Sequence, residues 1–239
     1  MAGDWVVIEE GEVPLRCWWN DPNQNNNNVA LILPEVFGVN SWVRSVVDRL
    51  AGHGFAALAM PLFARTAPLL DLGYSEEDLV EGRRHKKITT TENILTDASA
   101  AITWLRLIKQ KSNITVIGFC FGGHAALVTS TLPEVSSTFD FYGAGVSISR
   151  PGGGRPSLEL LPTIYGELTC LCGTSDPLIP ASDRNAIQDA LKKEDPEGSR
   201  LIYIEVESAG HGFMCEQRTS FNAEAASLGW DLLLEKLNS

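Results

Sequence analysis

The sequence of 239 residues lacks any apolar run that approaches the roughly 18 residues needed for a membrane-spanning helix. Its first residues show no basic segment followed by an apolar stretch, so we expect no signal peptide. Basic residues are also scarce: 19 Lys and Arg stand against 30 Asp and Glu, for a net charge of −11. A nucleic-acid-binding protein needs a basic face to displace counterions from phosphates, and an anionic membrane would repel this chain. We therefore predict neither a nucleic acid nor a membrane as a partner.

Cysteine is present but in a number and spacing that do not suggest disulfides. The five cysteines are scattered along the chain, and an odd number cannot all pair. Free thiols of this kind are typical of a reducing compartment, so we predict a cytoplasmic protein. Cys170 and Cys172 lie two residues apart in an expected strand, where both side chains share one face and serve as packing residues.

The length and composition favour one globular unit. Hydrophobic residues make up 44% of the chain, and 239 residues can bury most of their apolar surface without a metal or disulfide to hold them together. Chains of about 200–250 residues often form a single α/β domain. We therefore predict one domain over residues 1–239, present as a monomer or a small homo-oligomer.

Short, nearly all-apolar segments alternate with segments of helical periodicity. Such a pattern predicts an α/β fold with a mostly parallel central sheet and helices on both of its faces. The expected strands are residues 5–8, 13–19, 29–33, 55–60, 114–117, 138–142, 168–172 and 201–206, and the expected helices are residues 41–51, 76–87, 92–109, 122–130, 181–192 and 222–237.

Two segments are predicted to be irregular. The asparagine-rich stretch 20–28 is turn-forming, so we expect it to be a hairpin loop between the second and third strands. The Gly- and Pro-rich stretch 151–156 is expected to be an exposed loop.

The strongest motif is Gly118-Phe119-Cys120-Phe121-Gly122, between an apolar strand and a helix of small residues. It matches the nucleophile-elbow pattern G-x-S-x-G with cysteine in the nucleophile's place. The turn is so sharp that only glycine fits at both flanks, and it places the sulfur at a helix N-terminus that favours a thiolate. A small buried cysteine at a tight turn is the alternative reading.

A thiol nucleophile requires a base, and His211 in Ala209-Gly210-His211-Gly212-Phe213 is the best candidate. It follows the last expected strand and precedes the last helix, where an α/β-hydrolase carries its catalytic histidine. The other histidines have simpler interpretations: His53 is expected at a helix end, His85 on a solvated face, and His124 packed inside its helix.

Asp176 is the candidate for the carboxylate that orients this histidine. It follows the second strand after the nucleophile strand, so the order Cys120, Asp176, His211 is that of the hydrolase arrangement. Asp140 and Asp183 are rivals, although Asp183 is expected in a helix where it caps or faces solvent.

Glu35 follows the third strand at the carboxyl edge of the sheet, where ligands bind in open α/β folds. An exposed loop acid is the alternative. The backbone amides of Val36 and Phe121 would lie on either side of the nucleophile and form the oxyanion hole.

These residues resemble the dienelactone hydrolase (carboxymethylenebutenolidase) family of α/β-hydrolases. The matching stretches span about the whole chain in order: residues 35–40, 62–65, 118–123, 173–176 and 209–213. The resemblance implies a triad of Cys120, His211 and Asp176. It also implies that Glu35 takes part in activating the thiol when substrate enters.

The resemblance is weaker for the residues that would hold the substrate. The dienelactone-cleaving relatives bind a substrate carboxylate with arginines, one of them shortly after the histidine. Here Cys215 stands in that region, and the next arginine is Arg218. Arg83 or Arg84 could supply the other arginine, with Phe37 and Phe213 as further substrate contacts. Without the first arginine, we expect neutral esters and lactones to be cleaved at least as well as dienelactone.

The sequence thus predicts a hydrolase of small esters or lactones that works through an acyl-cysteine intermediate. It predicts no cofactor and no metal, because no metal-binding constellation is apparent. A non-catalytic ligand-binding protein of the same fold is the alternative.

Overall fold

A computed structural model describes residues 2–22 and 26–238. Its centre is an eight-stranded sheet with the strand order β1-β2-β4-β3-β5-β6-β7-β8. Within the described residues the strands are β1 (Asp4–Ile8), β2 (Leu15–Asn20), β3 (Asn28–Leu33), β4 (Ala56–Ala59), β5 (Asn113–Phe119), β6 (Val135–Phe141), β7 (Glu167–Gly173) and β8 (Leu201–Val206).

Helices connect the parallel strands, as right-handed crossovers between parallel neighbours require. They are α1 (Ser41–Gly52), α2 (Glu76–Ile88), α3 (Thr91–Leu107), α4 (Phe121–Thr129), α5 (Ala181–Glu194) and α6 (Ala223–Asn238), with a 3₁₀ segment η1 (Ser157–Thr163). The predicted helices and strands are all present, with ends that differ by up to three residues. The 3₁₀ segment was not predicted.

The sheet is parallel from β4 to β8 and antiparallel only at β1 and β2. The prediction of an α/β-hydrolase fold with a mostly parallel sheet is therefore confirmed. The hairpin predicted over residues 20–28 is wrong, because β4 lies between β2 and β3. Asn20 and Asn28 belong to the strands themselves, and residues 23–25 lie outside the described residues.

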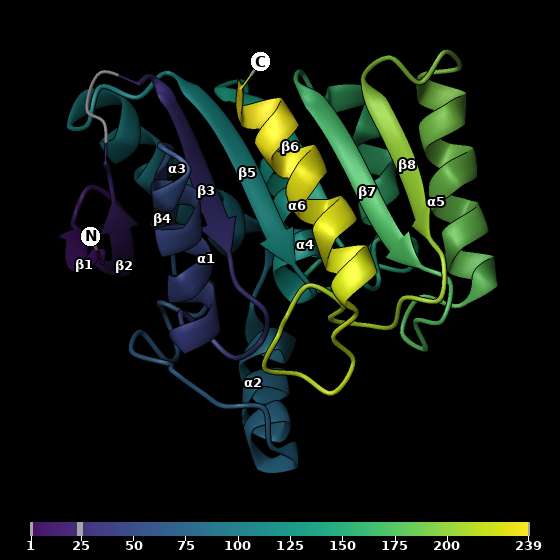
Figure 1. Ribbon diagram of the computed structural model, residues 1–239, viewed down its shortest axis with the longest axis horizontal. Helices are drawn as coiled ribbons and strands as arrows, with labels where there is room; N and C mark the ends of the chain where they lie inside the picture. The colour runs from purple at the N-terminus through teal and green to yellow at the C-terminus, as the bar shows by residue number, and fades with distance from the viewer. Residues whose placement is uncertain (1, 23–25, 239) are drawn as a thin grey trace.

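Helices cover both faces of the sheet. In Figure 1, α1 and α6 lie in front of the strands, whereas α3 and α4 lie behind them. Two buried clusters match these layers: one contains the apolar side chains of α1 and α6, and the other contains those of α3. Because both faces are covered, the central strands are apolar on both sides, which explains their uninterrupted hydrophobic sequences.

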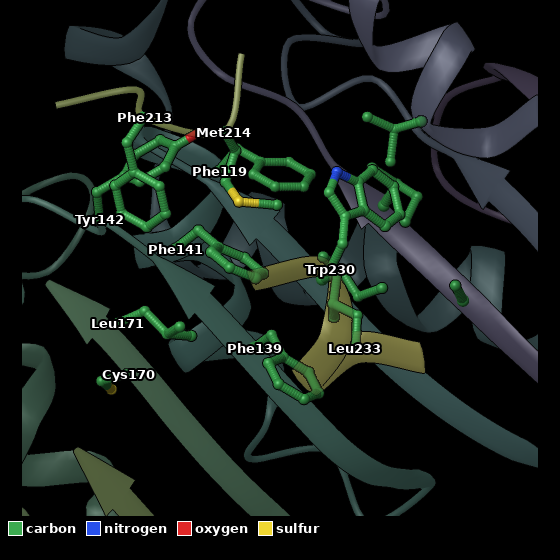
Figure 2. Packing of buried hydrophobic residues seen from close by; sticks show 14 of the residues in the cluster. Phe119, Phe139, Phe141, Tyr142, Cys170, Leu171, Phe213, Met214, Trp230 and Leu233 are labelled. Atoms are coloured by element: carbon green, nitrogen blue, oxygen red, sulfur yellow. The ribbon is translucent and has the colours of Figure 1, made fainter. Parts of the chain in front are cut away.

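Aromatic side chains fill the space between the sheet and α6 (Figure 2). Phe119 of β5 stacks on Phe141 of β6 with ring centroids 5.2 Å apart, and Phe141 in turn stacks on Phe139 at 6.1 Å. Trp230 and Leu233 of α6 pack against this group. The layer therefore fixes the ends of β5 and β6, from which the candidate site projects.

The helix α2 extends beyond the carboxyl edge of the sheet (Figure 1). Ser75 caps it by accepting a hydrogen bond from the amide of Asp78, whose side chain accepts one from the amide of Ser75. His85 was predicted on a solvated face, and this is wrong. Its ring is buried, with Nδ1 3.0 Å from Thr66 Oγ1 and Nε2 2.9 Å from the Glu81 carboxylate, so His85 anchors α2.

In the part of the chain that the structure describes, no helix combines the length and the apolarity needed to cross a bilayer.

Candidate active site

Cys120 occupies the turn between β5 and α4. Its φ of 56° and ψ of −117° lie in a region that residues with a side chain rarely adopt. Strain of this kind persists only where the surroundings enforce it, and it is frequent at functional positions. The Cys120 amide donates to the Phe141 carbonyl at 3.0 Å, which fixes the turn against the neighbouring strand.

The flanking glycines are required by close backbone contacts. A Cβ on Gly118 would collide with the Gly122 carbonyl, and a Cβ on Gly122 would collide with the Leu33 and Pro34 carbonyls. The elbow therefore lies directly against the end of β3. This contact brings the segment of Glu35 and Val36 beside the nucleophile position.

Cys120 differs from the other cysteines in its exposure. Its side chain is partly exposed, whereas Cys17, Cys170, Cys172 and Cys215 are buried. Burial raises the pKa of each of these four thiols, that of Cys215 to about 12. Since the thiolate is the nucleophile, the four buried cysteines are packing residues, and the prediction for Cys170 and Cys172 agrees with this.

Asp176 and His211 form a buried pair. His211 Nδ1 lies 2.8 Å from Asp176 Oδ2, and the other carboxylate oxygen accepts a hydrogen bond from the Leu178 amide at 2.8 Å. A carboxylate can only accept, so Nδ1 carries the proton and Nε2 faces away from the pair. The Asp176 side chain therefore fixes the tautomer and the orientation of the imidazole.

The remaining nitrogen, His211 Nε2, is buried and has no hydrogen-bond partner among the described residues. Burial alone lowers the pKa of His211, but the charges of Cys120 and Asp176 and the hydrogen bond to Asp176 raise it to about 10. The pair with Asp176 therefore favours the protonated form of the imidazole.

Glu35 is a buried carboxylate, 1% exposed, at the same edge of the sheet. Arg218 Nη1 donates to its Oε1 at 2.6 Å, while Oε2 is buried without a partner in the described structure. Burial raises the pKa of Glu35, and the charges of Arg218 and His211 oppose this increase. The protonation of Glu35 therefore depends on where the Arg218 guanidinium lies.

Some of these residues line a pocket of about 280 Å³. Cys120, His211 and Arg218 line it together with Val36 and Phe37, and α2 contributes Leu79, Arg83 and Lys86. The volume suits a small substrate, and the lining is apolar with a few convergent charged groups, as is usual for ligand sites.

The Phe121 amide lies at the N-terminus of α4, directly after Cys120. Phe121 is the first residue of α4, so its N–H has no acceptor within the helix and points with the positive end of the helix dipole. Val36 lies in the turn after β3 and lines the pocket beside Cys120. Among the described residues, no cluster of three or more His, Cys, Asp or Glu side chains could hold a metal ion.

The sequence of this chain is similar to those of a known protein family. The family model described as the dienelactone hydrolase family matches residues 15–239. A Synechocystis sp. protein whose name gives carboxymethylenebutenolidase as a provisional assignment is 37% identical over 84% of this chain and 82% of its own length. The carboxymethylenebutenolidase of Pseudomonas putida is 27% identical over 87% of this chain and 84% of its own.

The chain belongs to the dienelactone hydrolase family. A solved structure from Klebsiella pneumoniae, provisionally named as a dienelactone hydrolase, has the same fold, with a TM-score of 0.86 at 20% identity over 99% of this chain and 98% of its own. The predicted family and the predicted enzyme class, a dienelactone hydrolase-like enzyme acting on carboxylic ester bonds, are therefore confirmed.

Two of the four residues predicted to contact the substrate line the pocket, and the other two do not. Phe37 and Arg83 line the pocket with Cys120. Arg84 does not, since its side chain is 70% exposed and pairs with Glu81 on the outer side of α2. Phe213 is wrong as a substrate contact because it is fully buried, with its ring 5.0 Å from that of Tyr142.

One arginine after His211 does line the pocket, and it is Arg218. Cys215, which stood at the expected position, is fully buried, and an arginine there would have no access to the pocket. Arg218 lies three residues later and reaches the pocket beside Glu35 because the loop after His211 folds back toward β3. The spacing of residues along a loop does not reveal this path. The sequence shows only that Glu216 and Arg218 are charged residues shortly after His211.

The rival acid Asp140 lies in β6, buried, with its Oδ1 accepting the Gly143 amide at 2.8 Å. This hydrogen bond stabilises the backbone turn after β6, whereas His211 is hydrogen-bonded to Asp176. His124 packs as predicted, with its ring buried between the Ala144 carbonyl and Ser157.

Proposed function

We propose that this dienelactone hydrolase-family protein cleaves small esters and lactones with Cys120 as its nucleophile. One combination of features carries the proposal. The Cys120 thiol lies on a strained turn and is partly exposed to solvent. His211 is hydrogen-bonded to Asp176 through Nδ1, and its Nε2 has no partner among the described residues. A thiol, a base and an orienting carboxylate are the three parts that covalent acyl transfer requires.

The reaction proceeds in two halves. The thiol proton of Cys120 passes to His211, and the sulfur attacks the carbonyl carbon to form a tetrahedral oxyanion. The amides of Phe121 and Val36 donate to that oxygen. Collapse breaks the ester C–O bond as His211 protonates the leaving oxygen, which leaves an acyl-cysteine. Water, deprotonated by His211, then attacks this acyl group, and the sulfur departs as the acid is released.

Glu35 adds a means of activating the thiol when substrate enters. In the free protein, Arg218 is its counter-ion. A substrate carboxylate that attracts Arg218 removes the interaction that opposes the raised pKa of Glu35. Glu35 then becomes a stronger base, accepts the Cys120 proton and passes it on to His211. Arg218 and Arg83 are the pocket residues suited to such a substrate carboxylate.

With Arg218 in the pocket, a carboxylate-bearing substrate no longer lacks a partner. The preference for neutral substrates expected from Cys215 is therefore replaced by a preference for esters and lactones that carry one carboxylate near the reacting carbonyl. A pair of lactones that differ only in this carboxylate, compared by kcat/KM in wild type and Arg218→Gln, tests it.

We further infer that the protein acts in the cytoplasm as one domain, in monomeric or small oligomeric form. The free thiols, four of them buried, support a reducing compartment. Size-exclusion chromatography with light scattering measures the oligomeric state directly.

The nucleophile is tested by Cys120→Ala. The variant should fold normally, because the side chain projects off the sheet, and lose at least about 10³-fold in kcat toward aryl esters. Serine at this position should also be poor, because a hydroxyl needs a stronger base. Alkylation with iodoacetamide followed by peptide mapping should label Cys120 and spare the other cysteines. Near-wild-type turnover in the alanine variant would exclude Cys120 as nucleophile.

A further inference from the structure

A second groove lies next to the catalytic pocket and is strongly cationic. It has a volume of about 520 Å³ and is lined by Arg83, Lys86 and Lys87 of α2 and by Arg150 of the loop after β6. Among the described residues, no Asp or Glu lines it. Four positive charges around one groove are notable in a chain of net charge −11, where acidic residues outnumber basic ones by 30 to 19.

These four side chains have no acidic partner among the residues that the structure describes. None of them forms an ion pair with any residue that the structure describes, whereas the adjacent Arg84 is paired with Glu81. Arg150 Nε is in addition buried without a hydrogen-bond partner in the described structure. Uncompensated cations held close together repel one another, so the groove is stabilised when an anion occupies it.

The floor of the groove adds no charge of its own. His124 lies there with Nε2 2.7 Å from Ser157 Oγ, and burial lowers its pKa to about 4, so the ring is neutral at physiological pH. Phe121 forms another part of the floor, and Lys86 Nζ lies 5.3 Å from its ring centroid. The attraction of the groove for anions therefore comes from the cations at its rim.

The groove and the catalytic pocket are continuous. Arg83, Lys86, Ala144, Gly145 and Ile148 line both of them. A single molecule can therefore place a carbonyl at Cys120 and extend a second group past Lys86 to Lys87 and Arg150.

We propose that this groove is a substrate subsite for a second, multiply charged anionic group, a phosphate monoester, at the end of the substrate remote from the reacting carbonyl. The proposal rests on the proposed hydrolysis at Cys120 and extends it. A carboxylate near the reacting carbonyl already has Arg218 and Arg83, so Lys86, Lys87 and Arg150 remain for another group. Lysines and an arginine around one site match a phosphate dianion, which accepts several charge-assisted hydrogen bonds at once.

The test uses 4-nitrophenyl esters of a series of linear acyl chains that end in a phosphate monoester, each matched to the ester that ends in a hydroxyl. Wild type should prefer the phosphate member of the best-fitting pair by about tenfold or more in kcat/KM. Lys87→Gln and Arg150→Gln should each reduce kcat/KM for the phosphate ester by about tenfold and change that for the hydroxyl ester by less than about twofold. Arg84→Gln, one residue from Arg83 but outside the groove, is the matched control and should alter neither.

A binding measurement separates this proposal from the proposed function. Calorimetric titration of the Cys120→Ala protein with inorganic pyrophosphate should show binding that Lys87→Gln weakens about tenfold. If no ester is cleaved but pyrophosphate binds in this manner, the hydrolase proposal fails and the anion site stands. If the esters are cleaved without preference for the phosphate member, the subsite is overturned, whether or not pyrophosphate binds.

Discussion

At the scale of single residues, the site brings together groups that would be unfavourable anywhere else in the chain. Cys120 has a left-handed φ that a side chain makes costly, and Glu35 is a buried carboxylate with one oxygen unpartnered. Strain and unsatisfied polar groups each cost on the order of 1–3 kcal/mol. The fold tolerates both within one small region because the packed strand ends around them are rigid.

Asp176→Asn should abolish most of the activity while Asp140→Asn should not. An amide at position 176 can present its NH₂ to His211 Nδ1, which favours the wrong tautomer and removes the negative charge that supports the imidazolium. We expect kcat to fall by about 10³–10⁴-fold. Steady-state kinetics of the two variants on one aryl ester measures this, and comparable losses in both would mean that Asp140 contributes to the histidine's function.

Asp140 provides a separate prediction about stability and pH. Burial raises its pKa from 3.8 to about 7, so the folded protein binds this proton more tightly than the unfolded chain does. The stabilising contribution is complete below about pH 4 and is lost as the pH rises to about 7. Asparagine keeps the acceptor for the Gly143 amide but has no such loss.

The free energy of unfolding of Asp140→Asn should therefore rise relative to wild type between about pH 4 and pH 7 and then remain constant, with a gain of several kcal/mol at most. Urea denaturation across this range measures the difference. A gain independent of pH would show that Asp140 does not titrate in the folded protein.

Glu35→Gln tests the activation step. The amide has the shape of the carboxylate but cannot accept the Cys120 proton, so kcat/KM for carboxylate-bearing lactones should fall by about 10²-fold. Glu207→Gln makes the same change at an exposed position and should leave the rate unchanged. Equal rates for Glu35→Gln and wild type across the pH range would reduce Glu35 to a counter-ion for Arg218.

At the scale of elements, the placement of α2 decides the shape of the pocket. Gly82 allows this helix to approach the Val36 carbonyl so closely that a Cβ would collide with it. His85, one turn later, secures the same face to Thr66. The two contacts set where Arg83 and Lys86 enter the site.

Gly82→Ala should therefore lower kcat/KM by about tenfold or more, even though alanine favours helices by about 1 kcal/mol over glycine. The methyl group must displace either α2 or the turn that carries the Val36 amide. Gly52→Ala is the control, because a Cβ there meets nothing within 4 Å. Thermal unfolding is measured alongside the kinetics. If α2 is displaced, Gly82→Ala loses activity although the fraction of folded protein is unchanged. If the fold is destabilised, the fraction of folded protein falls as well.

The sequence was informative wherever a local rule determines the outcome. Apolar periodicity located the helices and strands, and the steric requirement for glycine located the elbow at Cys120. It was misleading where the answer depends on the packing of distant segments. The sequence did not predict that β4 lies between β2 and β3, because that pairing joins strands that are not consecutive in the chain. It also did not predict that His85 is buried and anchors α2, because the contact with Thr66 comes from another segment. Arg218 was overlooked for the same reason, because a loop's path is not encoded in its spacing.

At the scale of the whole molecule, two buried layers cover the sheet, and the candidate site lies in the loops at its carboxyl edge. Leu233→Ala should separate stability from activity. Leu233 is fully buried between α6 and the sheet, so its truncation should lower the free energy of unfolding by about 2–5 kcal/mol while kcat stays near that of wild type.

Leu228→Ala, on the same helix but 41% exposed, should change the free energy of unfolding by no more than about 0.5 kcal/mol. Chemical denaturation and kinetics on both variants measure the two quantities. A large loss of kcat in well-folded Leu233→Ala would show that α6 transmits strain to the His211 loop.

The insertion of β4 between β2 and β3 has a consequence for the order in which the chain assembles. The ribosome makes the β1–β2 hairpin before β3, α1 and β4, yet the partner of the hairpin in the sheet is β4, which pairs with it only after α1 has crossed over. Until then the hairpin is a two-stranded ribbon, which is at best marginally stable in water. The strands at this edge are therefore synthesised early but join the sheet late. The amides of β1 and β2 should acquire protection from hydrogen exchange later in refolding than those of β3 and β5.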